Sequence, residues 1–184
     1  MKELVKLFTQ IALLRRGPQD LPASMLLLVL AIVVYLVMNL LLNGLLPPPP
    51  VADAATRVAE AEQPNWSAQL LLDTCFTVVW YVALLSITGR PERTLQTTTA
   101  VFGIQIVLLP LLFLSRWLAP RFPQDSPGFV PVTLFGIVLL VWFVAATSHI
   151  VKAALEWSLG ASVALAVLQI LADWLLQRAL FPIA

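Results

Sequence analysis

The stretch GRPERTLQTTTAVFG, residues 89–103, separates two long apolar segments of this 184-residue chain. Gly89 is suited to end a helix, because glycine readily adopts the left-handed conformation of a C-terminal cap. Pro91 is suited to begin the next helix, because the first helical turn does not need its missing N–H group. The stretch therefore predicts a tight hairpin between two helices, with Arg90 and Arg93 at the turn.

The composition on both sides of this hairpin is typical of a membrane protein. Hydrophobic residues make up 60% of the chain and charged residues 11%, and the mean hydropathy is +0.91. Soluble domains are about 45–50% apolar and about 25% charged. The formal net charge of +1 gives no basis for a nucleic-acid partner.

Outward from the hairpin, apolar segments of roughly 20 residues recur, and each is long enough to cross a hydrocarbon core of about 30 Å as a helix. Glycines and prolines mark the ends of these segments. We predict an all-α, polytopic membrane protein that forms a single domain, residues 1–184. Its bundle of about five transmembrane helices is expected at residues 21–46, 66–88, 94–118, 130–157 and 161–181.

Residues 1–16 precede the first span. Leu4, Phe8, Ile11 and Leu14 recur at helical spacing, and the basic residues lie largely elsewhere on the wheel. This pattern is typical of an amphipathic helix in the headgroup region, and the alternative is a helix packed on the protein's own spans. We expect the interfacial position, with lipid-headgroup contacts from Lys2, Lys6, Arg15, Arg16, Arg90 and Arg93.

The distribution of basic residues predicts the orientation, because cytoplasmic loops carry an excess of lysine and arginine. With the N-terminus inside, the cytoplasmic side receives Lys152 and the six basic residues just named. The opposite side receives Arg57, Arg116, Arg121 and Arg178. The expected location is therefore a bacterial inner membrane, with the N-terminus cytoplasmic and the C-terminus on the other side.

Four polar residues fall inside predicted spans and form the candidate intramembrane site: Asp73, Gln105, His149 and Asp173. An ionisable side chain at membrane depth is costly unless it is paired or hydrated, which makes each one a site hypothesis. One interpretation is a path for ions, protons or solutes. In the other, Asp73 reaches the outer interface, and His149 marks the cytoplasmic end of a long helix together with Lys152 and Glu156, which can pair with each other.

Small and hydroxylated residues follow the hairpin, from Gln96 through the threonines at 97–99 to Gly103. Such residues let membrane helices approach each other closely. We expect this run to pack between helices rather than to line a substrate path.

Motifs of known catalytic chemistry are absent from the sequence. It contains no glycine-rich phosphate loop, no HExxH and no GxSxG. Cys75 and His149 are the only cysteine and histidine, too few for a zinc site, and we interpret Cys75 as an ordinary buried residue. We therefore predict a protein that is not an enzyme and that has no catalytic, cofactor-binding or metal-binding residues.

The hairpin motif and the later segment WFVAATSHIVKAALEWSLGASVALAV, residues 142–167, resemble bacterial members of the Yip family, the Ypt/Rab-interacting membrane proteins. The resemblance covers most of the chain from Leu70 onward, together with LLRRGPQDLPAS at residues 13–24. It implies an N-terminal cytoplasmic segment followed by about five clustered helices. It carries over no functional residues, and the Rab-linked role of eukaryotic relatives does not transfer to such a short N-terminal segment.

These observations favour a non-enzymatic integral membrane protein that scaffolds or shapes the membrane, or stabilises a partner complex. The alternative is an oligomeric small transporter or channel subunit, in which the intramembrane polar residues form an ion, proton or solute path. The expected partners are membrane lipids and either further copies of the chain or another membrane protein.

Overall fold

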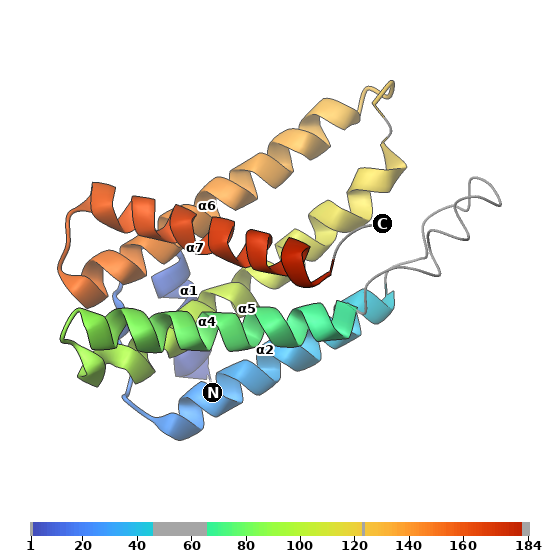
Figure 1. Cartoon of the computed structure of the whole chain (residues 1–184). Helices are drawn as coiled ribbons and strands as arrows, with labels where there is room; N and C mark the ends of the chain where they lie inside the picture. Colours follow the sequence, from blue (N-terminus) through green and yellow to red (C-terminus); the bar gives the residue numbers. More distant parts are fainter. Residues whose placement is uncertain (1, 46–65, 123, 182–184) are drawn as a thin grey trace.

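The computed structural model describes residues 2–45, 66–122 and 124–181 (Figure 1). Within these ranges the chain forms six α-helices and no strand: α1 Lys2–Ala12, α2 Met25–Leu45, α4 Trp66–Ile87, α5 Thr94–Leu118, α6 Phe129–Leu155 and α7 Leu159–Leu180. Three short 3-10 helices join them, η1 Pro18–Asp20, η2 Pro91–Arg93 and η3 Ala119–Arg121. The predicted all-α fold is confirmed.

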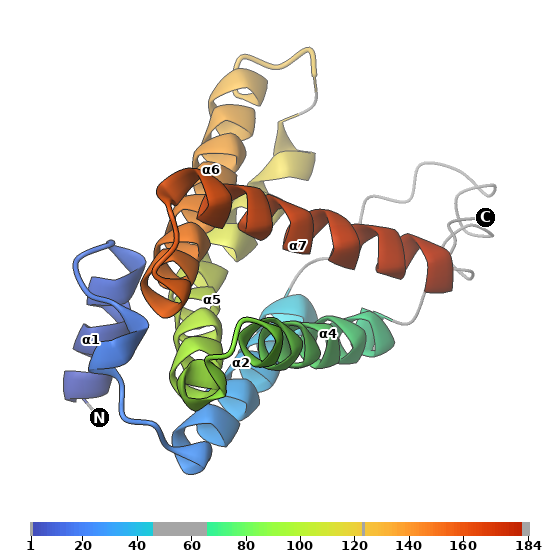
Figure 2. The ribbon, with the colours of Figure 1, turned by 60° about the vertical axis from the view of Figure 1, so that its left-hand side comes forward.

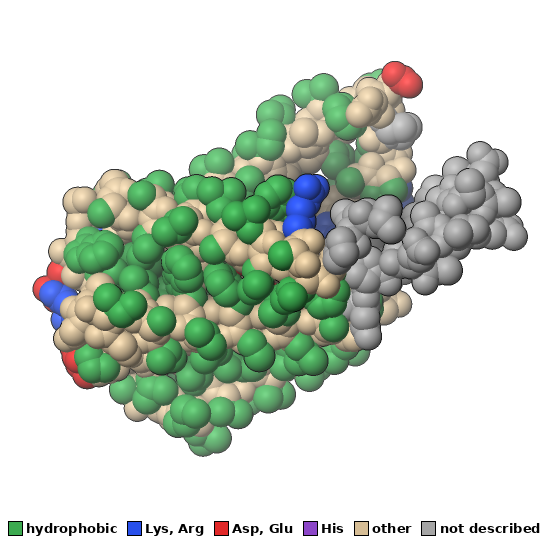
Figure 3. Space-filling view, in the orientation of Figure 1, with side chains coloured by type: hydrophobic (Ala, Val, Ile, Leu, Met, Phe, Trp, Pro, Cys, Tyr) green, Lys and Arg blue, Asp and Glu red, His purple; other side chains and the backbone are tan. Residues whose placement is uncertain are grey.

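Five of the helices in the described part of the chain, α2 and α4 to α7, are long and apolar enough to cross a membrane. Hydrophobic side chains cover the sides of the helices in Figure 3, and the charged side chains visible there lie toward the ends. The protein is therefore an integral membrane protein. Its helix bounds agree closely with the predicted spans, except that α2 begins at Met25 rather than Leu21, where the hydroxyl of Ser24 accepts a hydrogen bond from the Leu27 amide (3.3 Å).

Helix α5 is the centre of the bundle. It packs against α1, α2, α4 and α6, and α6 in turn packs against α7. In Figure 2 the first half of α5 lies among the other helices, and its second half rises with α6 away from α4 and α7. Most of the deeply buried large side chains belong to the enclosed half, among them Tyr81, Phe102, Ile104 and Ile150.

The N-terminal helix α1 packs on this core. This position corresponds to the alternative interpretation of residues 1–16, a helix packed on the protein's own spans. Ile11 and Ala12 are fully buried, and the indole of Trp142 donates a hydrogen bond to the carbonyl of Ala12 (2.7 Å). The ring of Phe8 occupies the space that a side chain at Gly103 would fill. The apolar face of α1 is thus covered by α5 and α6, and it is not free to enter lipid by itself.

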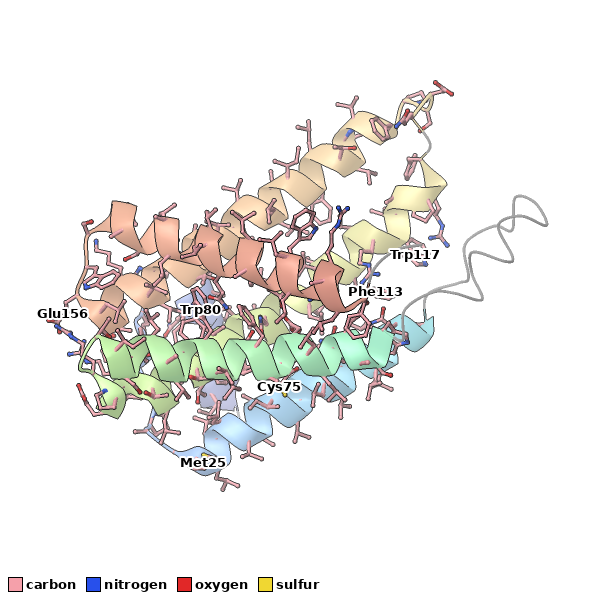
Figure 4. All side chains as sticks on the ribbon, viewed as in Figure 1. Met25, Cys75, Trp80, Phe113, Trp117 and Glu156 are labelled. Atoms are coloured by element: carbon pink, nitrogen blue, oxygen red, sulfur yellow. The ribbon has the colours of Figure 1, made fainter. Side chains whose placement is uncertain are left out.

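Two predictions about small polar residues had opposite outcomes. Thr97, Thr98 and Thr99 are almost completely buried between helices, which confirms that this run packs. Cys75, in contrast, is exposed on the surface of α4 (Figure 4), so its interpretation as a buried residue is wrong. The apolar neighbours of Cys75 do not imply burial, because lipid is as apolar as a protein core and helix faces can point toward it.

Candidate functional site

The hairpin at residues 89–93 is a structural joint. Gly89 has φ +73°, the left-handed conformation expected for a helix cap, and Pro91 begins η2. Nη1 of Arg90 lies 2.9 Å from Oε1 of Glu156, and Nη2 of Arg93 lies 2.7 Å from the same oxygen. We call Arg90, Arg93 and Glu156 the arginine clasp, because they join the α4–α5 turn to the end of α6.

Arg93 makes the more extensive contacts of the two arginines. Its Nη1 donates to the carbonyl oxygens of Ala153 (3.2 Å) and Ala154 (2.9 Å). These carbonyls belong to the last turn of α6, where no further helical amide is available to them. Arg93 therefore satisfies the end of one helix from the beginning of another.

The clasp also determines the charge state of its acid. Hydrogen bonds from Arg90 and then Arg93 hold the pKa of Glu156 at about 2, below its ordinary value of 4.5, and the pKa of Arg90 is raised by the same partner. Lys152 and Glu156, which helical spacing would allow to pair, form no ion pair within the described residues. Glu156 has left the helix with φ +58°, and its carboxylate meets the arginines of the opposite turn (Figure 4).

At the other end of the bundle, three adjoining cavities of about 340, 330 and 180 Å³ lie between α2, α4, α5, α6 and α7. We call these cavities together the polar crevice. The cavities share lining residues with one another. Their lining includes charged, amide and hydroxyl side chains: Tyr35, Asn39, Asn43, Gln69, Asp73, Gln105, Arg116 and Gln177. The crevice thus brings together two of the four residues singled out from the sequence, Asp73 and Gln105.

Asp73 is the acidic group at the centre of the crevice. The hydroxyl of Tyr35 in α2 donates a hydrogen bond to its Oδ2 (2.9 Å). Asp73 lies seven residues into α4, or about 10 Å along the helix from Trp66. The carboxylate is therefore well inside the span, and a neighbouring helix holds it in place.

Asp173 adjoins the crevice through Gln177. The amide of Gln177 donates to Oδ2 of Asp173 (2.8 Å), and Gln177 lines the same cavity as Asp73. Oδ1 of Asp173 and Oε1 of Gln105 are buried and have no hydrogen-bond partner among the described residues.

His149 lies apart from this group. Its Nε2 is 3.0 Å from the carbonyl of Arg16, and it lines a separate cavity with Lys152 and Glu156 at the clasp end. The second interpretation of this trio, as the end of a long helix, agrees with the end of α6 at Leu155. A relay that includes His149 together with the aspartates is not assembled.

The basic residues expected at lipid headgroups divide into two groups. Lys6, Arg15 and Arg16 are exposed, whereas Arg90 and Arg93 form the ion pairs of the clasp. The side chain of Lys2 lies outside the described part of the chain. Two residues of the other predictions, Arg57 and Leu46, also lie outside it. A further cavity of about 300 Å³ lies beside the clasp, and it shares no residue with the polar crevice.

Sequence reasoning missed several residues of the crevice. Tyr35, Asn39 and Asn43 recur every four residues in α2, so they lie on one helix face, and this spacing was a usable signal. Arg116 was counted only for topology. The hydrogen bond from Tyr81 to Gln169 (2.7 Å), which is buried in the other half of the bundle, had no sequence signal because its partners are 88 residues apart.

Within residues 2–45, 66–122 and 124–181, no three His, Cys, Asp or Glu side chains gather closely enough to hold a metal ion. The crevice instead offers carboxylate, amide, hydroxyl and guanidinium groups, which bind ligands through hydrogen bonds and ion pairs. No family model, curated protein or solved structure matches the chain. The fold and the crevice therefore define the class, an integral membrane protein with a polar cavity inside its helix bundle.

Proposed function

We propose that this membrane protein is a subunit of a small transporter or channel, which moves an ion or a small polar solute through the polar crevice. The single observation that carries the proposal is the position of Asp73. Its carboxylate lies well inside a span, is oriented by Tyr35, and lines two of the three cavities. Ionisable groups at such depth are costly and typically belong to substrate or ion pathways.

The two ends of the bundle support a pathway that is open at one side only. Polar lining residues extend from Arg116 and Asn43 near the helix ends inward to Tyr35, Asp73 and Gln105. Beyond them the core is closed by apolar residues and by the hydrogen bond between Tyr81 and Gln169. This arrangement is that of a half-pathway, in which movement of the closed half would complete transport.

A flux experiment tests the proposal. Proteoliposomes that contain the full chain would be compared with protein-free liposomes. A pH-sensitive dye would measure proton flux. Light scattering after osmotic shifts would measure the flux of glycine, glycerol and potassium chloride. We expect faster flux of at least one of these species, and slower flux for Asp73→Asn and Asp173→Asn. Arg121→Gln, at the same end but outside the crevice, is the matched control and should retain wild-type flux. Flux equal to that of protein-free liposomes throughout would contradict the proposal.

A scaffold or assembly role is the second candidate, and the exposed arm formed by α5 and α6 favours it. Of the five spans, α6 has the smallest buried share in its most apolar segment, 11%. Its outer half exposes apolar side chains along one side of the helix: Val130, Leu134, Ile137, Val138, Leu140 and Val141. Such an arm can pack against a second copy or against another membrane protein.

Cross-linking tests this second candidate. Val138→Cys would be introduced into a Cys75→Ser background, because the exposed native thiol would otherwise react as well. We expect cross-linked species in native membranes if the arm is an assembly surface. A chain that remains monomeric with Cys at 138 and also with Cys at 134 would argue against assembly through this arm.

We also propose that the chain is a Yip-family protein of a bacterial inner membrane, with the clasp end in the cytoplasm. The motifs at residues 89–103 and 142–167 support the family, and the basic residues at the clasp end support the orientation. A membrane-impermeant thiol reagent tests the orientation. It would be applied to Glu62→Cys and Arg90→Cys, each in the Cys75→Ser background, and we expect labelling at 62 from outside and at 90 from the cytoplasm. Cytoplasmic labelling at position 62 would overturn it.

A further inference from the structure

The polar crevice carries charges of opposite sign at different depths. Asp73 and Arg116 line the same 180 Å³ cavity, although they come from α4 and α5. Asp73 lies well inside its span, whereas Arg116 lies two residues before the end of α5. A ligand that extends from the interior toward the mouth of this cavity would meet a carboxylate first and a guanidinium second.

Arg116 differs from the other arginines at this end of the described structure. The guanidinium of Arg121 stacks 3.3 Å from the centre of the Trp117 ring and donates to the Trp117 carbonyl. The guanidinium of Arg178 lies 4.5 Å from the centre of the Trp174 ring. Arg116 forms neither an ion pair nor a hydrogen bond within the described residues, and it lines two of the three cavities. It is therefore available to an anionic group, for which its five donors are suited.

The crevice is also rich in hydrogen-bond acceptors, from Asn43 near the helix ends inward to Asp73. Asn39 and Asn43 use their amide NH₂ groups to donate to backbone carbonyls, at 2.9 and 2.8 Å, which leaves their side-chain oxygens as acceptors. Oδ2 of Asp73 already accepts from Tyr35, and its Oδ1 forms no hydrogen bond within the described residues. Carboxylate and amide oxygens together suit a group with several N–H donors and a positive charge, as in a primary ammonium.

We propose that the polar crevice binds a small zwitterion, with its primary ammonium group at Asp73 and its phosphate or carboxylate group at Arg116. This inference rests on the proposed function of the crevice and names the substrate class. The required chemistry occurs both in free solutes, such as amino acids and phosphoethanolamine, and in the headgroup of an aminophospholipid. The crevice lies in the membrane part of the bundle, so both sources can reach it.

Equilibrium binding to the purified full chain in phosphatidylcholine nanodiscs tests the site. The probe is O-phosphoethanolamine, with phosphocholine and ethanolamine as comparators, measured by isothermal titration calorimetry. Phosphocholine lacks N–H donors, and ethanolamine lacks the anionic group, so both are expected to bind more weakly than O-phosphoethanolamine by about tenfold or more. Equal binding of all three, or no binding of O-phosphoethanolamine, would overturn the proposal.

Substitutions locate the two ends of the ligand. Arg116→Gln and Asp73→Asn should each weaken O-phosphoethanolamine binding by about tenfold or more, because each removes one charge-assisted contact. Arg121→Gln is the matched control and should bind as the wild type does. Arg116 is exposed near a helix end, so its variant tests the proposal even if Asp73→Asn fails to fold. Unchanged binding in Arg116→Gln would contradict the proposed orientation and the site.

A change of lipid distinguishes the two sources. If phosphatidylethanolamine nanodiscs abolish binding of O-phosphoethanolamine, the lipid headgroup occupies the site. If binding persists there, the ligand is a free solute; both results support a zwitterion site. Binding needs no gradient, so binding without any flux would remove the transport proposal alone, and flux without zwitterion binding would remove this inference alone.

Discussion

The two halves of α5 lie in opposite environments. From Thr97 to Ile104 the helix is almost completely buried, whereas from Leu109 to Arg116 it lines the polar crevice. Beside each half of α5, a tyrosine of a neighbouring helix donates a hydrogen bond to the side chain of a further helix. Tyr81 donates to Gln169 in the buried half, and Tyr35 donates to Asp73 in the open half. The same kind of bond thus occurs once in a closed core and once in a cavity.

The difference indicates what each polar group is for. Buried polar groups stabilise a fold when they satisfy each other, as Tyr81 and Gln169 do. Polar groups around a cavity that retain free acceptors or an unpaired charge add little to the fold and are available to a ligand. Stability should therefore be sensitive to changes in the buried half, and binding to changes in the open half.

The largest effect on stability is expected from Gly103→Leu. A side chain there would overlap the ring of Phe8 and push α1 away from α5. Overpacking of a core typically costs about 1–3 kcal/mol, and the melting temperature, followed by intrinsic tryptophan fluorescence, should fall accordingly. Gly44→Ala is the control, because nothing lies within 4 Å of its added methyl group. Equal melting temperatures for the two variants would show that α1 does not pack on α5 as described.

The tyrosine pair gives the sharpest comparison of the halves. Tyr81→Phe leaves the buried Gln169 oxygen without its donor, a loss of about 1–3 kcal/mol in unfolding free energy. Tyr35→Phe should cost less than about 1 kcal/mol, because Asp73 lines a cavity in which water can replace the lost hydroxyl. Chemical denaturation of both variants measures the difference. A larger loss for Tyr35→Phe would reverse the proposed roles of the two halves.

Much of the fold could be predicted from the sequence, because span length and helix-ending residues are local signals. The hairpin at Gly89 and Pro91 was predicted from single residues whose backbone preferences are strong. Burial was harder to predict, as Cys75 illustrates. In a membrane protein a helix face toward lipid and a face toward the core can be equally apolar, so composition does not separate them.

The candidate site was predicted only in part. Asp73 and Gln105 were found because polar residues stand out within apolar spans, and the structure brings them together. His149 stood out for the same reason but lies at the clasp end, because sequence position does not fix which helix faces meet. Arg116 was overlooked as a site residue, since an arginine near a span end is usually a topology signal.

At the clasp end, Arg93→Gln should have a larger effect than Arg90→Gln. Arg93 contacts two backbone carbonyls as well as Glu156, whereas Arg90 contacts Glu156 alone. We expect a fall in melting temperature of about 2–4 °C for Arg93→Gln, the scale of one lost net interaction of about 1 kcal/mol in a chain of this size. The fall for Arg90→Gln should be smaller, because an exposed ion pair contributes little. Equal falls would mean that the carbonyl contacts add nothing.

The smallest expected effect is the pH dependence of the clasp. Because the arginines lower the pKa of Glu156 from 4.5 to about 2, the folded state favours the ionised acid. The resulting stabilisation is fully present above pH 4.5 and is lost as the pH falls toward 2. The melting temperatures of wild type and Glu156→Gln should therefore differ near neutral pH and converge in acid. Glu92→Gln is the control, because Glu92 forms no ion pair within the described residues. If the melting-temperature difference between wild type and Glu156→Gln stays constant down to pH 2, Glu156 acts through its position at the helix end rather than through its charge.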